Sequence, residues 1–144
     1  MTTMLQLVTS TQAKRLKALG FDWGVTAYYQ HTSGDDTLEY VYQKPTNING
    51  RSTGNWSEYS APTVAEALKW VRDVKKIVCF TVFRHPKLGW EHCVWEPCPY
   101  GHRVVYNDRG YLTNDLAEHD LLNVVLGEIE RIEQIERLEK ETKK

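Results

Sequence analysis

The sequence has no long apolar run and no glycine-rich motif of the kind that binds nucleotide phosphates. A membrane-spanning helix needs about 18 or more consecutive apolar residues, so none is expected here. The glycine patterns of P-loops and dinucleotide-binding folds are also missing, so no phosphate-binding loop is expected. These absences remove the readily recognised ATP- and NAD-dependent classes of enzyme.

Charge and cysteine content exclude further classes. The formal net charge is −1, from 18 basic and 19 acidic residues, which argues against a protein whose main role is to neutralise phosphates. The three cysteines are an odd number, which suits a reducing compartment better than a secreted disulfide framework. The first residues lack the basic and apolar stretches of a secretory signal. We therefore expect a cytoplasmic protein without a cofactor.

The strongest structural signal lies between Ser60 and Arg84, where an amphipathic helix passes almost directly into an apolar strand. Thr63 and Glu66 have the spacing of a capping box, which predicts the start of the helix. Residues 77–84 are apolar on both faces, which predicts a strand in the middle of a sheet. The apolar stripe of the helix consists of Val64, Ala67, Leu68, Val71 and Val74.

Weaker periodic signals complete the expected fold. They predict helices over 9–19 and from Thr113 past Leu138, and strands over 25–31, 38–43, 90–96 and 102–107. Turns are expected at 97–101 and 108–110, and fraying over 139–144. The 144 residues are thus expected to form one α+β domain, with an antiparallel sheet of about five strands and about three helices mainly on one face.

Residues 44–59 are the longest stretch without a period, and such loops are often functional. Arg51, Trp56 and Tyr59 are the candidate binding residues, because a glycine-rich segment with a guanidinium and two rings can close over a ligand. The alternative, which we favour, is a surface loop whose Trp56 and Tyr59 pack beneath the Thr63 helix.

Five potential metal ligands lie close together in the sequence: His85, His92, Cys93, Cys98 and His102. They lack the paired cysteines typical of zinc sites. In a strand, His92 and Cys93 would also point to opposite faces and could not share an ion. No metal site is therefore predicted, and the chain has no cysteine-enzyme signature that would make Cys93 or Cys98 a nucleophile.

The C-terminal helix changes character after Ile129. Apolar residues then recur at every third position, and each such step turns the line by about 300° around the helix. One flat surface cannot cover the whole line, so either the helix end wraps across its own domain or a second chain covers it. The second possibility predicts a homodimer through Ile132, Ile135 and Leu138.

Several segments resemble small uncharacterised proteins of phages and mobile elements of gut bacteria. They are residues 8–21 (Val-Thr-Ser-Thr-Gln-Ala-Lys-Arg-Leu-Lys-Ala-Leu-Gly-Phe), the Tyr28-Tyr29 pair, Tyr59-Ser-Ala-Pro-Thr63 and Leu68-Lys-Trp-Val-Arg72. The resemblance covers the first half of the chain well and the second half in outline. It implies a genomic context and a cytoplasmic setting, and it assigns no activity and no functional residue.

These observations favour a non-enzymatic binding or accessory protein that works through protein contacts. One alternative is nucleic-acid binding through Lys14, Arg15, Lys17 and Arg51. The other is a small enzyme with its pocket under the loop of residues 44–59.

Overall fold

The computed structural model describes residues 6–32, 34–42, 44–50, 57–99 and 101–142. The chain divides into two compact units, residues 1–70 and 71–144. Helix α2 (Val64–Val74) begins in the first unit and ends in the second.

The first unit combines one helix with a small antiparallel sheet. Helix α1 (Ser10–Ala18) is followed by β1 (Ala27–Thr32), β2 (Asp35–Tyr40) and β3 (Glu58–Ser60). The sheet has the order β2-β1-β3, so the predicted hairpin is present and β3 adds a third strand on its other side.

Local capping explains where the helices of the first unit begin. Thr9 Oγ1 accepts a hydrogen bond from the backbone of Gln12, and the Gln12 side chain accepts one from the Thr9 N–H at 2.9 Å. Thr63 and Glu66 form the same reciprocal pair at the start of α2. Both capping boxes are those that the sequence predicted.

Apolar packing holds the first unit together around Trp70, which is fully buried on α2. Phe21, just after α1, meets its ring edge to face with 5.4 Å between the ring centroids. Such aromatic pairs add about 0.5–1.5 kcal/mol beyond the area that they bury. The surrounding core includes Val8, Ala13, Leu16, Val25, Ala27, Ile48, Ala61, Val64, Ala67 and Leu68.

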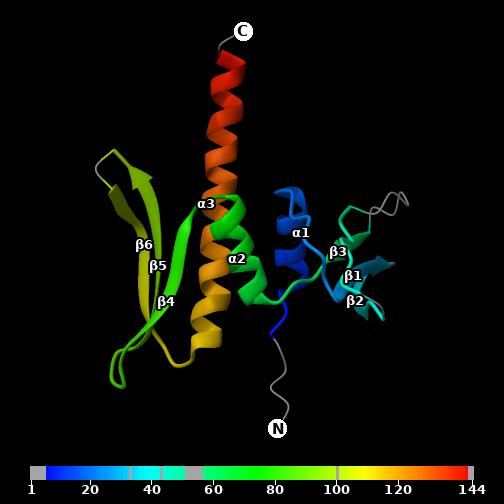
Figure 1. Cartoon of the computed structure of the whole chain (residues 1–144), viewed down its shortest axis with the longest axis horizontal. Helices are drawn as coiled ribbons and strands as arrows, with labels where there is room; N and C mark the ends of the chain where they lie inside the picture. Colours follow the sequence, from blue (N-terminus) through cyan, green and yellow to red (C-terminus); the bar gives the residue numbers. More distant parts are fainter. Residues whose placement is uncertain (1–5, 33, 43, 51–56, 100, 143–144) are drawn as a thin grey trace. The chain divides into compact units, whose positions relative to one another are not determined.

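The second unit is an antiparallel sheet with a long helix on one face. Strands β4 (Val78–His85), β5 (Gly89–Cys98) and β6 (Gly101–Tyr111) follow one another in a meander. Helix α3 (Asn114–Thr142) lies along the sheet, and its C-terminal part extends past it (Figure 1). The helix buries Ala117, Leu121, Leu122, Val125, Leu126 and Ile129.

The fold class is α+β, as predicted, but the single sheet of five strands is wrong. The described strands form two antiparallel sheets of three strands each. The central position expected for residues 77–84 is also wrong, because β4 pairs with β5 alone among the described strands and β5 is the middle strand.

The Arg72 guanidinium donates to the Cys79 carbonyl at 3.2 Å and so satisfies one carbonyl of β4.

Several boundaries differ from those expected. β5 continues through Pro97 to Cys98, and β6 continues through 108–110 to Tyr111, because two register shifts accommodate the extra residues of the β5–β6 pair. β3 takes up Glu58 and Tyr59 of the predicted loop. Helix α3 runs to Thr142, into the tail expected to fray. Within the described residues, no helix is both long and apolar enough to cross a membrane.

Two glycines in the second unit allow a matched test of the β4–β5 turn. Gly89 and Gly110 both have positive φ, at 73° and 97°. A Cβ on Gly89 would lie 2.6 Å from the Tyr111 carbonyl oxygen, whereas a Cβ on Gly110 meets nothing within 4 Å. Gly110→Ala should cost about 1–2 kcal/mol, the price of the left-handed conformation.

Gly89→Ala should cost about 1–3 kcal/mol more than Gly110→Ala, because the added methyl also displaces backbone. Urea denaturation, monitored by circular dichroism, measures the free energy of unfolding of each variant. If the free energy of unfolding falls by the same amount in the two variants, the close contact with Tyr111 does not contribute to the cost.

Candidate functional site

Of the three binding residues expected from the sequence, the structure describes one. Arg51 and Trp56 lie outside the described residues. Tyr59 is half-buried in β3, and the amines of Lys14 and Lys17 lie 5.6 and 5.1 Å from the centroid of its ring. Both distances fall within the range of cation–π contacts.

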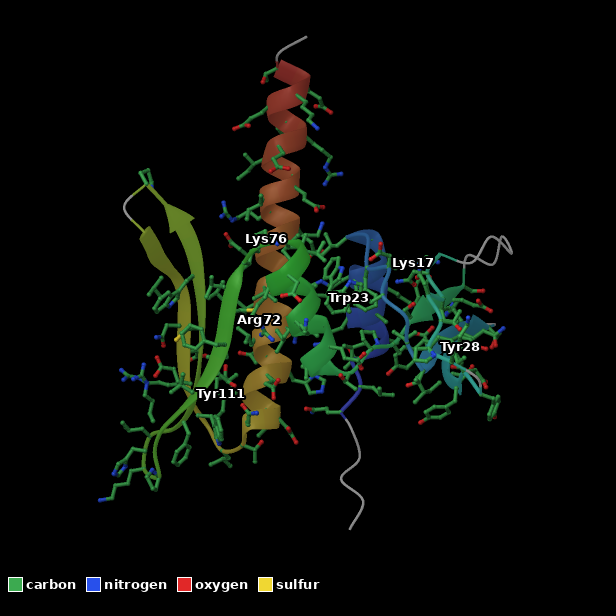
Figure 2. The ribbon with its side chains drawn as sticks, viewed as in Figure 1. Lys17, Trp23, Tyr28, Arg72, Lys76 and Tyr111 are labelled. Carbon is green, nitrogen blue, oxygen red and sulfur yellow. The ribbon has the colours of Figure 1, made fainter. Side chains whose placement is uncertain are left out.

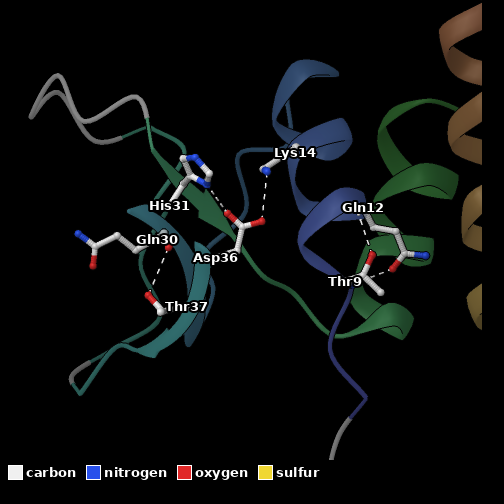
Figure 3. Close-up of polar contacts among 7 residues, drawn as sticks. All are labelled: Thr9, Gln12, Lys14, Gln30, His31, Asp36 and Thr37. Atoms are coloured by element: carbon white, nitrogen blue, oxygen red, sulfur yellow. Dashed lines mark hydrogen bonds and ion pairs between the residues drawn. The ribbon is translucent and has the colours of Figure 1, made fainter. Parts of the chain in front are cut away.

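Two basic side chains of α1, Lys14 and Lys17, are engaged within their own unit. Lys14 forms an ion pair with Asp36 at 3.1 Å, and His31 Nδ1 lies 2.7 Å from the other oxygen of the same carboxylate (Figure 3). Lys17 donates to the Glu58 carbonyl at 2.9 Å. Hydrogen bonds from His31 and Lys14 lower the pKa of Asp36 below its ordinary value.

A cluster of polar side chains lies in the second unit, where β5, β6 and α3 meet. It consists of His92, Asp108, Tyr111 and Asp120, and we call it the His92 cluster. His92 belongs to the middle strand and points to the sheet face that α3 covers, where it is fully buried. Asp108 and Tyr111 come from the end of β6, and Asp120 comes from the second turn of α3.

Tyr111 is at the centre of the His92 cluster, near the point where β6 leads into α3 (Figure 2). Its hydroxyl lies 2.9 Å from His92 Nε2 and 3.1 Å from Asp108 Oδ2, and it donates to Asp120. His92 Nε2 is also 2.9 Å from Asp120 Oδ2. The His92 and Tyr111 rings lie 5.1 Å apart, centroid to centroid.

The surroundings shift the pKa values of two members in opposite directions. Burial, together with the nearby Asp120 and Asp108 carboxylates, raises the pKa of Tyr111. Burial acts to raise the pKa of Asp120 as well, but hydrogen bonds with Tyr111 and His92 outweigh it and lower that pKa. The cluster therefore holds a neutral phenol against an ionised carboxylate.

The carboxylates of the His92 cluster reach solvent, whereas its imidazole does not. His92 is fully buried, whereas the Asp120 side chain is 41% exposed and Asp108 is exposed. A shallow depression leads to the carboxylates, and its lining consists of Asp108, Tyr111, Leu116, His119, Asp120 and Asn123.

A second polar network occupies the opposite face of the sheet. The buried Glu91 carboxylate accepts hydrogen bonds from Arg84 and Asn107, and the Cys93 thiol lies 3.5 Å from it. Burial raises the pKa of Cys93, and the adjacent Glu91 carboxylate raises it further. The thiol is therefore protonated at neutral pH, which is the wrong state for a nucleophile or a metal ligand.

The two networks confirm that His92 and Cys93 point to opposite faces of the strand. For Cys98 and His102, only the backbone is described. The histidine and cysteine spacing therefore did not lead to the cluster, because the partners of His92 are carboxylates that lie far from it in the sequence. The sequence held only two signals for the His92 cluster. One was the period-two alternation of side chains in β5, and the other was the acidic residues at the end of β6 and the start of α3.

One short pattern was not singled out in the sequence. Gly50-Arg-Ser-Thr-Gly54 matches the Gly-x-Ser-x-Gly pattern of hydrolases with a nucleophilic serine. In the α/β-hydrolases, where this pattern forms the nucleophile elbow, a strand comes directly before the serine and a helix directly after it. Residues 51–56 lie outside the described part, and the next described element after them is the strand β3 rather than a helix. The described context therefore does not support a catalytic serine.

Comparisons with protein-family models, curated proteins and solved structures give no match. The resemblance to phage and mobile-element proteins therefore stays a prediction.

The ion pairs of Asp36 should make the stability of the protein depend on pH. Because folding lowers its pKa, Asp36 contributes stability above the pKa of the unfolded chain, about 4, and loses that contribution as the pH falls through the folded value. Asp36→Asn should therefore lower the urea midpoint at pH 7, and the difference from wild type should shrink below about pH 4.

The adjacent Asp35→Asn is the matched control, since Asp35 is exposed and has no ion pair with a described residue. Its midpoint should follow that of wild type at every pH. A difference for Asp36→Asn that stays constant from neutral to acid pH would contradict the assigned role of the carboxylate.

Proposed function

We propose that this protein is a non-enzymatic binding protein that works through protein contacts and pairs with a second copy of itself through the end of α3. The observation that carries the proposal is apolar surface on that helix. Ile135 is 42% exposed and Leu138 is 53% exposed, and residues 134–142 are all exposed. We call Ile135 and Leu138 the apolar ridge.

The length of the helix also supports a partner. The last buried residue of α3 is Ile129, yet the helix continues to Thr142. Isolated helices shorter than about 12–15 residues are marginal in water, so an end of this size gains from packing against something. The Glu128–Arg131 ion pair contributes only about 0.2–0.5 kcal/mol. A second helix that covers the apolar ridge supplies the missing contact.

The same surface also contains a groove into which the apolar ridge of a second copy can fit. The groove beside the ridge is lined by four apolar and three charged side chains, and two of the charged ones, Lys75 and Glu133, form an ion pair at 2.8 Å. Its lining consists of Val74, Lys75, Ile77, Ile129, Ile132, Glu133 and Glu136. In a two-fold dimer, the ridge of each copy can enter the groove of the other, and such an arrangement closes on itself. This self-complementarity favours a second copy over an unrelated partner.

Other features support a binding role over the alternatives. Lys14 and Lys17 bind Asp36 and the Glu58 carbonyl, which reduces the positive charge available for a nucleic-acid phosphate. The raised pKa of Cys93 disfavours a cysteine nucleophile. The free thiols of Cys79 and Cys93 suit the expected cytoplasmic setting. Residues 51–56, the middle of the loop predicted to cover an enzyme pocket, lie outside the described part.

Sedimentation velocity tests the dimer directly. The full chain should sediment as a dimer at micromolar concentration, and Ile135→Glu or Leu138→Glu should give a monomer, because each places a charge in the apolar contact. Gln134→Glu is the matched control, since it adds the same charge at a neighbouring exposed position off the ridge. It should remain a dimer.

A chain that ends after Glu130 provides a second test, because it lacks the ridge and Ile132 but keeps all the buried residues of α3. It should fold, as judged by circular dichroism, and sediment as a monomer. A wild-type chain that is monomeric over the whole concentration range overturns the proposal. So does an Ile135→Glu variant that stays dimeric.

A further inference from the structure

We propose that His92, Asp108 and Asp120 bind a divalent first-row transition-metal ion, which fastens α3 to strands β5 and β6. The three residues come from three different elements of the second unit. An ion at this place would link the helix to both strands through coordinate bonds. The site is separate from the apolar ridge, so the proposal goes beyond self-association.

The spacing of the donor atoms suits one ion. One ligand atom from each of His92, Asp108 and Asp120 can be chosen so that all three lie within 4.8 Å of one another. Nitrogen and oxygen ligands bind zinc at about 2.0–2.2 Å, which places the ligands of one ion roughly 3–4 Å apart. His92 Nε2 and Asp120 Oδ2 are already 2.9 Å apart. A small movement of the exposed Asp108 completes the set.

The hydrogen bonds of the cluster provide an independent argument for a cation. Four close contacts join His92, Tyr111 and the two carboxylates. The Tyr111 hydroxyl has one proton, and His92 Nε2 has at most one, so these protons can satisfy only two of the four contacts at a time. Asp108 and Asp120 in particular share one phenol proton. A divalent cation interacts with both carboxylates at once and removes this shortage.

Burial and access fit a metal site as well. The fully buried His92 imidazole is held in place by the sheet and α3, which provides one rigid ligand. The partly exposed Asp120 and the exposed Asp108 lie along the shallow depression, which gives an ion a route from solvent. Rigid donors on secondary structure with one open side are what a selective site requires.

The donor set indicates the class of ion. One imidazole nitrogen and two carboxylate oxygens, without sulfur, suit Zn²⁺ or Mn²⁺. Calcium and magnesium prefer sites made of oxygen alone, so the imidazole disfavours them. The buried thiol of Cys93 lies on the other face of the sheet and takes no part.

Calorimetric titration of the full, chelator-treated chain with ZnCl₂ and, separately, MnCl₂ tests the proposal. Wild type should bind at least one of these ions saturably, and its thermal midpoint should rise in the presence of that ion. Asp108→Asn and Asp120→Asn should each weaken binding by about 100-fold or more, because loss of even an outer-shell partner costs about 10–100-fold. Both positions are accessible to solvent, so these variants should fold.

Asp115→Asn is the matched control, because Asp115 is an exposed acidic residue in the first turn of the same helix. Its affinity should stay within about threefold of wild type. Binding that is equally tight in Asp120→Asn and wild type overturns the proposal, since the ion would then occupy another place. The absence of saturable binding of either ion to wild type also overturns it.

Tyr111→Phe tests the ligand set itself. The Tyr111 hydroxyl donates to the Asp108 and Asp120 carboxylates and is not itself one of the three ligands, so its removal should weaken binding by at most about 10–100-fold, as expected for an outer-shell partner, and by less than Asp120→Asn does. A loss in Tyr111→Phe as large as that in Asp120→Asn would overturn the assignment of His92, Asp108 and Asp120 as the complete set of protein ligands.

Discussion

The apolar packing of α3 against the sheet is the contact on which the second unit depends. Leu121, Leu122 and Val125 are fully buried in it. Asp120 comes directly before this buried run. The packing that forms the core therefore also fixes the position of the Asp120 carboxylate along the sheet, beside His92. A shift of the helix by one turn would move Asp120 by about 5.4 Å and break every contact that it makes in the His92 cluster.

Features that depend on neighbouring residues could be predicted from the sequence. The two capping boxes, Thr9 with Gln12 and Thr63 with Glu66, were predicted because both partners lie within one helical turn. The hairpin of β1 and β2 and the long C-terminal helix followed from periodicity for the same reason. In each case the deciding interaction is local, so the pattern alone contains the information.

Features that depend on distant residues could not be predicted in this way. The sequence shows that both faces of residues 78–83 are apolar, but it does not show which strands lie on either side. β4 carries apolar residues on both faces although, among the strands that the structure describes, it pairs with β5 alone. This is because α3 covers one face and Phe80 packs on Trp95 of β5 on the other. The His92 cluster depends likewise on the register of β6 and the position of α3. Neither is encoded in the spacing of the histidines and cysteines.

The alternation of side chains along β5 has a consequence for how this chain can diverge. Glu91 and Cys93 belong to the network on one face of the sheet, and His92, between them, belongs to the cluster on the other. Insertion or deletion of a single residue within this strand exchanges the two faces, so it would place an imidazole among the partners of Glu91 and a carboxylate against α3. Relatives of this protein should therefore tolerate changes of length at the hairpin ends while the number of residues through the middle of β5 stays constant.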